Sequence, residues 1–531
     1  MKNKKLDWFI LPLFLFLVVF LRLPSFFQSV LSNDESLYLL MASSLTDGQP
    51  PYTAIWDNKP IGIYILFYLA LLILGDSVLS IRILACIAVS ITCYLLYRLG
   101  NVISLNDTKV GLLAGILYAI LSLGGGGLAS NTEIFYASFV VFAFYLLFSV
   151  VINPAKRIST RNLRLFIIGL LMGIGVQIKQ VVIFEFIAIL LILGIVLYFQ
   201  TINSRRSLFT ELFKCYVLLV VGLVLPFLST LLYFIFNGHF SDYYYANFAA
   251  NLVRVSGESF SINNFLTGFL TQVKSNLLLW VCLFLTPFYW VSSKETAFEK
   301  RNLTYLLIWF FMAFLGVCSP KSFYAHYFLQ LLPSLCLLSA YIIIKTVWAA
   351  REIGTTRRLS ILALILVTPL LSNVYPYLKV GIKSVYFQYI KGIDNWGDSP
   401  AIISKYLRER VAPQDYIYVA DYVPIIYYLI PAKIPTKYAF TAFLTSPNLS
   451  KVAGIDPVQE LHSIMERKPV YIIRVKQKEV KREKFYTELD RYIKIYYKFE
   501  KEFNVDGDIF EITKSDAYSV ELHRLKNKTV D

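Results

Sequence analysis

Charged residues are scarce in this sequence, and their scarcity excludes an ordinary soluble domain. Only 16% of the 531 residues are Asp, Glu, Lys or Arg, whereas 57% are hydrophobic, and the mean hydropathy is +0.58. Apolar runs of about 20 residues, the length that crosses the hydrocarbon core of a bilayer, recur along the chain. The sequence therefore predicts an integral membrane protein with many spans.

Cysteine is also rare, and its distribution excludes a disulfide framework. All six cysteines fall in or beside the apolar runs, and none lies in the polar C-terminal region. The run Gly124–Gly127 lacks the Lys-Ser/Thr ending of a phosphate-binding loop. No small-residue cleavage site follows the basic start "MKNKK", so we do not expect a removed signal peptide. We also find no internal repeat and no low-complexity segment.

About eleven apolar segments have the length and composition of transmembrane helices. A further segment, 61–74, is short and begins after Pro60, so we interpret it as a helix lying along the membrane interface. The predicted spans are residues 8–22, 80–97, 110–123, 134–151, 165–177, 182–200, 215–236, 275–292, 303–318, 328–347 and 359–375.

The basic residues between these spans are distributed unequally. Eighteen Lys and Arg residues fall in one alternate set of connections, and only four fall in the other, namely Lys59, Lys179, Arg254 and Lys321. Because basic residues accumulate on the cytoplasmic side, we expect the N-terminus in the cytoplasm. An odd number of spans then places the C-terminal region outside. The same bias explains the net charge of +16, so nucleic acid is not an expected partner.

The chain changes character near Pro376, after which charges become frequent. The pattern predicts strands at 416–420, 469–475, 509–513 and 517–521 and helices at 399–410 and 479–497. We therefore expect a small extracytoplasmic α/β domain at 395–531. The other predicted parts are a membrane domain at 1–375, whose first outer loop 23–79 holds interfacial helices, and a linker at 376–394.

A pair of adjacent carboxylates, Asp34 and Glu35, follows the first span. Ser32-Asn33-Asp34-Glu35 fits a capping box, in which Glu35 folds back on the first turn of a helix at 33–46. In that interpretation Asp34 is only a favourable charge at a helix N-terminus. The alternative is a catalytic carboxylate. Asp34 and Tyr38, four residues apart, share one face of this helix.

Other polar clusters are predicted on the same outer face. They are "WDNKPIGIY" with Lys59, "ASNTEIFYA" with Glu133, "SPKSFYAHYFLQLLP" with Lys321, Tyr324, His326 and Tyr327, and a tight turn with Lys179. Each has an ordinary explanation, such as a snorkelling lysine, a charge at a helix start or an interfacial tyrosine. Acids and bases gathered on one face, against the charge bias, together favour a functional site.

The stretch 34–82 resembles the first outer loop of the polyprenyl-phosphate-sugar glycosyltransferases of the GT-C fold, of the glycosyltransferase family 39 type. These enzymes include protein O-mannosyltransferases and bacterial transferases that add aminoarabinose to lipid A. An Asp-Glu pair, a Gly-x-x-x-Tyr, a Lys-Pro and a Gly-x-x-x-x-x-x-Arg occur here in the family's order. "HYFLQLLP" resembles a later family motif, and an outer α/β domain suits the bacterial branch.

The resemblance implies an enzyme that moves one sugar from a lipid phosphate carrier to an acceptor hydroxyl outside the cytoplasm. It implies that Asp34 is the catalytic carboxylate and that Lys59 binds the carrier phosphate. Glu133 falls where many members carry a second acidic residue, so we predict Asp34 and Glu133 as the catalytic residues. Some members have a Glu directly before the Lys-Pro that is linked to metal binding, and this chain has Asn58 there. A divalent metal therefore has weak support, and no cofactor is assigned.

The chemistry of the residues agrees with this reaction. A carboxylate must take the proton of the acceptor hydroxyl, and positive charge must stabilise the leaving phosphate. One base and no second nucleophile predict inversion at the anomeric carbon. Phosphate-binding candidates are Lys59, Lys179, Lys321, His326 and Tyr327, and supporting residues are Glu35, Tyr38 and Tyr324. The expected partners are a polyprenyl-phosphate-linked sugar, a glycolipid, glycan or protein acceptor, and the lipid bilayer of the inner (plasma) membrane.

Two other classes of protein share some of these features. A lipid-linked sugar flippase or transporter also has many spans, but a carrier is expected to show midplane charges and paired broken helices in two halves. A non-catalytic scaffold for envelope assembly has only the outer domain in its favour. Replacing Asp34 with Asn separates the three classes, because only the enzyme should lose sugar transfer while keeping its membrane level and fold.

Overall fold

The structure, a computed structural model, describes residues 4–151, 158–201, 207–257, 259–292, 296–348, 354–476, 483–505 and 518–526. The chain divides into two compact units. We call them the helical unit (Met1–Leu23, Ile83–Tyr233 and Phe260–Pro376) and the α/β unit (Pro24–Arg82, Phe234–Ser259 and Tyr377–Asp531). Each unit is thus assembled from three separate stretches of the chain.

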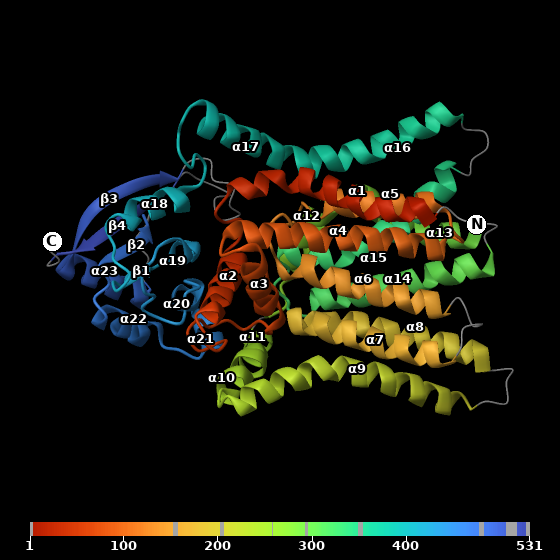
Figure 1. Cartoon of the computed structure of the whole chain (residues 1–531), viewed down its shortest axis with the longest axis horizontal. Coiled ribbons are helices and arrows are strands. Elements are labelled where there is room, and N and C mark those ends of the chain that lie inside the picture. Colours follow the sequence, from red (N-terminus) through yellow and green to blue (C-terminus); the bar gives the residue numbers. More distant parts are fainter. Residues whose placement is uncertain are drawn as a thin grey trace. The chain divides into compact units, whose positions relative to one another are not determined.

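Long apolar helices build the helical unit (Figure 1). Short 3₁₀ segments, η2 (Gln180–Val182) and η4 (Ala325–Leu331), connect some of them. The helices are α1 (Lys4–Arg22), α4 (Val78–Ile103), α5 (Thr108–Leu121), α6 (Thr132–Val151), α7 (Ile158–Ile178), α8 (Ile183–Thr201), α9 (Leu208–Phe236), α12 (Ile262–Ser275), α13 (Leu277–Ser292), α14 (Ala297–Cys318), α15 (Leu332–Ile343) and α16 (Thr355–Pro369), of which α4 begins and α9 ends in the α/β unit.

Nine helical segments of the described residues are long and apolar enough to cross a membrane, or ten if a bent pair counts as one span. The bent pair is α12 and α13, which meet at 95°. Nine of the eleven predicted spans correspond to these nine segments, and 275–292 corresponds to the second half of the bent pair. The predicted span 110–123 is α5, whose 14 residues reach only about 21 Å, less than the bilayer core of about 30 Å. The predicted class, a multi-span helical membrane protein, is confirmed.

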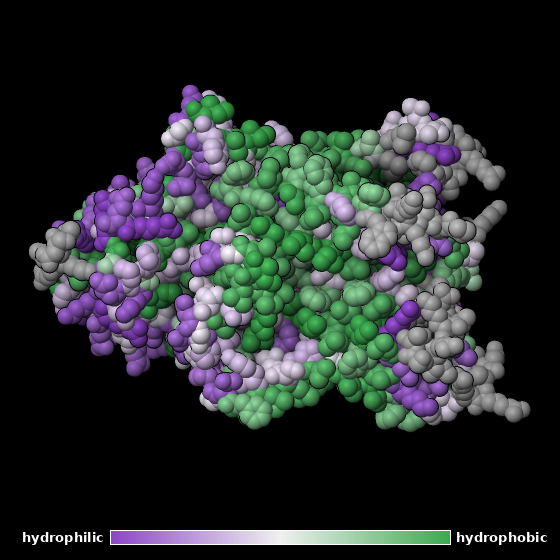
Figure 2. Space-filling view, viewed as in Figure 1, coloured by the Kyte–Doolittle hydropathy of each residue, from purple (hydrophilic) through white to green (hydrophobic). Residues whose placement is uncertain are grey.

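Glycines let two of these helices approach closely. Gly169 and Gly173 lie one turn apart on α7 and face the backbone of α9. A methyl group at Gly169 would lie 2.1 Å from the carbonyl oxygen of Leu219, and one at Gly173 would lie 2.4 Å from that of Leu223. Such spacing of small residues is typical of helix packing in lipid, where close van der Waals contact drives association. Figure 2 shows the hydrophobic residues that cover the sides of the helical unit.

The α/β unit combines the first loop of the chain with its C-terminal region. Its strands form one sheet in the order β1-β2-β4-β3, in which β1 and β2 are parallel and the other two pairs are antiparallel. The strands are β1 (Ile417–Val419), β2 (Tyr471–Val475), β3 (Tyr497–Val505) and β4 (Tyr518–Leu525). The helices are α2 (Asn33–Thr46), α3 (Gly62–Leu74), α10 (Phe240–Tyr244), α11 (Ala250–Gly257), α17 (Tyr375–Val385), α18 (Ser399–Arg408), α19 (Ile425–Leu429), α20 (Ala442–Thr445), α21 (Pro447–Ala453), α22 (Pro457–Glu466) and α23 (Lys484–Tyr496).

The predicted strands at 416–420, 469–475 and 517–521 are confirmed as β1, β2 and β4, and both predicted helices are confirmed as α18 and α23. The strand predicted at 509–513 lies outside the described residues. The sequence analysis missed β3, which begins where the helical pattern changes to the charged-apolar alternation "KFEKEF". The predicted linker 376–394 is helical up to Ile390, through α17 and a π-helical turn at Tyr386–Ile390.

Polar and aromatic contacts join the first loop to the C-terminal region within the α/β unit. The buried carboxylate of Asp398 accepts hydrogen bonds from the backbone N–H of Ser29 at 2.6 Å and from its hydroxyl at 2.5 Å. The backbone N–H of Trp56 donates to the carbonyl of Lys437 at 2.8 Å, and the Trp56 ring packs against Phe443 with centroids 4.8 Å apart. The C-terminal region therefore contacts both the start of the first loop and the stretch just before Lys59.

Candidate functional site

The helix α2 presents Asp34 in its first turn. Ser32 is the N-cap, and its hydroxyl accepts a hydrogen bond from the backbone N–H of Asp34 at 3.2 Å. The Asp34 side chain is 24% exposed. A carboxylate at this end of a helix is stabilised by the helix dipole and can still be reached by a ligand.

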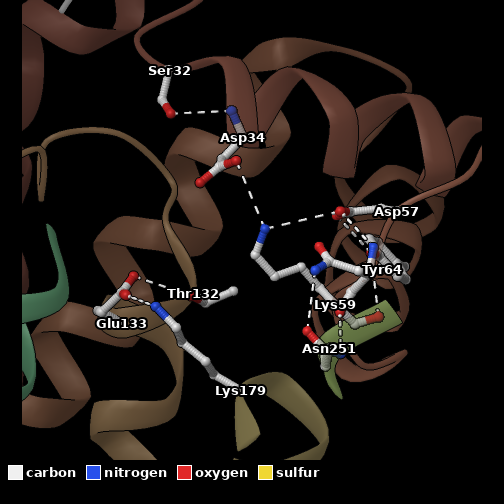
Figure 3. A network of polar contacts seen from close by, with 10 residues as sticks. Ser32, Asp34, Asp57, Lys59, Tyr64, Thr132, Glu133, Lys179 and Asn251 are labelled. Atoms are coloured by element: carbon white, nitrogen blue, oxygen red, sulfur yellow. Dashed lines mark hydrogen bonds and ion pairs between the residues drawn. The ribbon is translucent and has the colours of Figure 1, made fainter. Parts of the chain in front are cut away.

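Lys59 lies between two carboxylates. Its Nζ is 3.8 Å from Oδ1 of Asp34 and 3.9 Å from Oδ1 of Asp57, and all three side chains point toward one another in Figure 3. The same Nζ lies 5.5 Å from the centroid of the Tyr38 ring, within the range of a cation–π contact. The structure thus brings Asp34, Tyr38 and Lys59 together. We call these residues, with Asp57, the Asp34–Lys59 cluster.

Asp57 anchors the loop that carries the lysine. Its buried carboxylate accepts hydrogen bonds from the Tyr64 hydroxyl at 2.9 Å and from the backbone N–H of Asn58 at 2.7 Å. Burial raises the pKa of Asp57 above its ordinary value of 3.8, with Lys59 opposing the rise and the charge of Asp34 adding to it. Because Asp57 is buried and Asp34 is partly exposed, Asp34 is the better placed of the two to meet a ligand.

Asn58 occupies the position where some members of the family that the sequence resembles carry a metal-linked Glu. Its amide donates to the side-chain oxygen of Asn251 at 3.1 Å, and the Asn251 amide donates to the Asn58 carbonyl at 3.0 Å. Among the described residues, no group of three or more His, Cys, Asp or Glu side chains could hold a metal ion. The ammonium group of Lys59 lies between the two nearest carboxylates. These residues therefore do not fit a divalent cation.

Glu35 forms an ion pair with Arg82, and the predicted capping box is wrong. Both oxygens of the buried Glu35 carboxylate contact the Arg82 guanidinium, one of them at 2.6 Å. One oxygen also accepts the backbone N–H of Leu31 at 2.5 Å, whereas a capping box would bond the N–H of Ser32. A planar, two-bonded pair with arginine is stronger than a neutral cap hydrogen bond, so it determines where the Glu35 side chain lies.

A second polar cluster lies in the helical unit, at the start of α6. The buried Glu133 carboxylate forms an ion pair with Lys179 and accepts the hydroxyl of Thr132 at 3.0 Å (Figure 3). The Nζ of Lys179 also lies 3.9 Å from the centroid of the Tyr327 ring. Glu133, Lys179 and Tyr327, three of the predicted site residues, are thus brought together, and we call them the Glu133–Lys179 cluster.

The remaining predicted residues lie in or just before η4. The rings of Tyr324 and His326 are stacked with centroids 5.9 Å apart, and His326 meets Tyr327 edge-on at 4.8 Å. Lys321 stands in the preceding turn with a positive φ of 60°. Tyr324 and His326 therefore extend the aromatic surface beside Tyr327.

The sequence analysis did not identify several further hydrogen-bonded or ion-paired polar residues as site residues. They are Asp57, Tyr64, Arg82, Asn251 and the buried Glu185, which accepts hydrogen bonds from Trp309 at 2.9 Å and Gln330 at 3.2 Å. Asp57 could have been found, since it stands two residues before Lys59 in a tight loop. No local signal indicates Asn251, which contacts Asn58 across 193 residues of sequence.

One sequence family matches part of the chain. Residues 58–234 match the family described as dolichyl-phosphate-mannose-protein mannosyltransferase. The match begins one residue before Lys59 and includes Glu133 and Lys179. A search of curated proteins finds no match to the chain.

Solved structures share the fold of the whole chain. ArnT from Cupriavidus metallidurans bound to undecaprenyl phosphate is similar with a TM-score of 0.62 at 12% identity, covering 98% of both chains. Its apo state has a TM-score of 0.57 at 11% identity, covering 96% of this chain and 97% of that one. The Archaeoglobus fulgidus oligosaccharyltransferase in the apo form has a TM-score of 0.50 at 13% identity, covering 89% and 70%. The predicted GT-C fold is confirmed.

Proposed function

We propose that this protein is a membrane glycosyltransferase that moves a single sugar from a polyprenyl-phosphate donor to an acceptor hydroxyl by inverting displacement. The observation that carries the proposal is the Asp34 carboxylate at the start of α2, 3.8 Å from the ammonium group of Lys59. A base and a phosphate-binding cation are the two groups that the reaction requires. The shared fold with a protein bound to undecaprenyl phosphate supports the class of donor.

In the proposed reaction Asp34 is the general base. Its carboxylate takes the proton of the acceptor hydroxyl while the acceptor oxygen attacks the anomeric carbon of the donor sugar. The bond between that carbon and the phosphate oxygen breaks, and the polyprenyl phosphate leaves with its electron pair. Because one carboxylate acts and no sugar–enzyme bond forms, the configuration at the anomeric carbon inverts.

Lys59 stabilises the phosphate as it leaves. Its distances of 3.8 and 3.9 Å to the two carboxylates exceed the value of about 2.7–2.9 Å of a short charge-assisted hydrogen bond. Neither of these two pairs is short, so a phosphate oxygen can compete with Asp34 and Asp57 for the ammonium group of Lys59. The buried Asp57 and the aromatic face of Tyr38 keep the lysine near Asp34.

For the Glu133–Lys179 cluster we propose a supporting role in donor binding. Lys179, Lys321, His326 and Tyr327 remain our candidates for additional phosphate contacts. Glu133 holds Lys179 by a buried ion pair, so we assign Glu133 to positioning this cation and keep Asp34 as the base.

A comparison of envelope molecules tests the function. Mass analysis of envelope glycolipids and glycoproteins from cells with and without the protein should reveal one added sugar that depends on it. Cells that make Asp34→Asn should lack this sugar at a normal membrane level of the protein. Asp107→Asn is a matched control, because Asp107 caps α5 and Asn caps a helix equally well. Identical glycans in all four samples would refute the proposal.

The orientation that we propose puts the N-terminus in the cytoplasm and residues 395–531 outside. Ser463, an exposed residue of α22, is a suitable site for an engineered cysteine. Five of the six native cysteines are buried, so background labelling should be low. Intact cells should be labelled at Ser463→Cys by a membrane-impermeant reagent. Labelling only after lysis would contradict the orientation.

A further inference from the structure

A cavity lies in the α/β unit. It has a volume of about 930 Å³ and is lined by the C-terminal half of α2, the loop after it, and the segments around β1 and α19. Sites for small molecules occupy about 300–1,000 Å³, so the cavity is large enough for a ligand. None of its lining residues belongs to the Asp34–Lys59 cluster.

One wall combines an aromatic ring with two cations. The Nζ of Lys433 lies 5.9 Å from the centroid of the Tyr416 ring, and the guanidinium carbon of Arg467 lies 5.7 Å from it. The backbone at Tyr416 is held on both sides, because the Tyr416 carbonyl accepts the N–H of Val470 at 2.7 Å and Tyr416 forms a parallel bridge with Lys433. In the described part of the chain, neither cation forms an ion pair with a carboxylate, so both can contact an anionic ligand.

Two carboxylates also line the cavity. Asp47 caps the C-terminal end of α2 and is exposed, and Asp76 accepts a hydrogen bond from the Tyr428 hydroxyl at 2.6 Å. Carboxylates accept hydrogen bonds from hydroxyl groups, whereas cations bind phosphate or carboxylate groups. The negative face of an aromatic ring suits the weakly positive C–H groups of a sugar ring. Carboxylates, cations and an aromatic ring in one cavity together suit a saccharide that carries an anionic group.

We propose that this cavity binds an anionic saccharide segment of the acceptor, with a sugar ring on Tyr416 and a phosphate or carboxylate group between Lys433 and Arg467. This inference rests on the proposed function, since it assigns a chemical class to the acceptor of that reaction. Asp34 and Asp47 stand near opposite ends of α2, and 13 residues of helix separate them by about 20 Å. The acceptor is therefore an oligosaccharide or the head group of a glycolipid, longer than one sugar.

Binding to the full-length protein in lipid nanodiscs tests the proposal with three probes. These are pentamannosyl phosphate, tetragalacturonic acid and the neutral sugar mannopentaose, each measured by isothermal titration. The two anionic probes should bind at least about tenfold more tightly than mannopentaose, because charge-assisted contacts contribute about 1.5–3 kcal/mol. The anionic probe that binds with the higher affinity indicates whether the natural group is a phosphate or a carboxylate.

Substitutions of residues that line the cavity test whether the probes bind there. Lys433→Gln combined with Arg467→Gln should weaken the anionic probes about tenfold or more and leave mannopentaose unchanged. Lys494→Gln combined with Lys498→Gln, exposed cations elsewhere in the same unit, is the matched control and should change nothing. Tyr416→Leu should weaken all three saccharides. Unchanged binding in the double variant, or inorganic phosphate binding as tightly as pentamannosyl phosphate, would overturn the proposal.

This test separates the inference from the proposed function. Asp34→Asn should bind the anionic probes like the wild type, because Asp34 does not line the cavity. If the probes bind and no sugar transfer is found, the saccharide site stands and the glycosyltransferase proposal fails. If sugar transfer is found but the probes do not bind, only the saccharide site is refuted.

Discussion

Two neighbouring carboxylates of α2 lie in opposite surroundings. The Asp34 side chain is 24% exposed, and its Oδ1 lies 3.8 Å from Nζ of Lys59. The Lys59 side chain is 16% exposed. Glu35, the next residue, is 2% exposed and pairs through both oxygens with Arg82, which is 1% exposed. One residue step on a helix therefore separates a loose, accessible ion pair from a tight, buried one.

The difference indicates different roles for the two pairs. A buried bidentate pair holds its groups in one geometry, and removing one partner leaves a charge without compensation. A loose pair at a helix start can exchange its partner for a substrate group at little cost. We infer that the pair of Glu35 and Arg82 fixes the start of α2 within the α/β unit, so that Asp34 is held at a defined place and remains reactive.

Asp34→Asn should have the largest effect on the reaction. The substitution keeps the shape of the side chain and removes its basicity, so turnover should fall by about 10²–10⁴-fold. The apparent unfolding temperature should change little, because the lost pair is partly exposed. Transfer of a radiolabelled sugar from a lipid-linked donor measures the first quantity, and thermal unfolding in detergent measures the second. Normal turnover of Asp34→Asn would show that Asp34 is not the base, and the two carboxylates would then not differ in the way we infer.

Glu35→Gln should affect stability and not the chemical step. The change leaves the buried Arg82 guanidinium without its counter-charge, and breaking a buried pair typically costs about 3–5 kcal/mol. Thermal unfolding should therefore shift strongly, while the protein that remains folded keeps measurable turnover. Arg82→Gln should behave in the same way, and combining both changes should cost less than the sum of the two. Loss of turnover at unchanged stability would assign the catalytic role to Glu35.

Lys59→Gln should weaken donor binding. A contact with phosphate is worth about 1.5–3 kcal/mol, so donor affinity should fall at least about tenfold. The fold should be preserved, because Gln can still lie between Asp34 and Asp57. Competition by undecaprenyl phosphate is a suitable measurement, and Lys109→Gln, an exposed lysine beside Asp107, is the control. Unchanged affinity would direct attention to Lys179, Lys321 or His326.

Asp57→Asn should have the smallest effect, visible as a change in pH dependence. Burial raises the pKa of Asp57 in the folded protein above 3.8, so its contribution to stability is present in full below that value. The contribution is lost as the pH rises through the raised pKa. Relative to Asp57→Asn, the wild type should therefore lose stability as the pH rises from 3.8 through the raised pKa of Asp57. Parallel unfolding temperatures of the two proteins across this pH range would show that the carboxyl is not perturbed.

The fold was largely predictable because membrane spans are long and apolar. The exceptions have physical causes: α5 is apolar but short, and β3 follows a helix without a break in the chain. The site was only partly predictable. The proximity of Asp34 and Lys59 came from a family resemblance, since 25 positions separate them in the sequence.

Competition among side chains could not be predicted from local sequence. The pattern Ser32-x-x-Glu35 is a good capping box, and only the folded chain shows that Arg82, 47 residues away, takes the carboxylate instead. The amide pair of Asn58 and Asn251 depends in the same way on distant parts of the chain. Tertiary contacts decide such cases, because a charged pair outweighs a neutral hydrogen bond.

The configuration of the product is the most direct test of the central claim, a single displacement with Asp34 as the base. Purified protein would be incubated with a polyprenyl-phosphate donor of known anomeric configuration, and the product bond would be assigned by NMR. The account predicts inverted configuration with the wild type and no product above background with Asp34→Asn. A product of retained configuration, or an inverted product formed at the normal rate by Asp34→Asn, would contradict it.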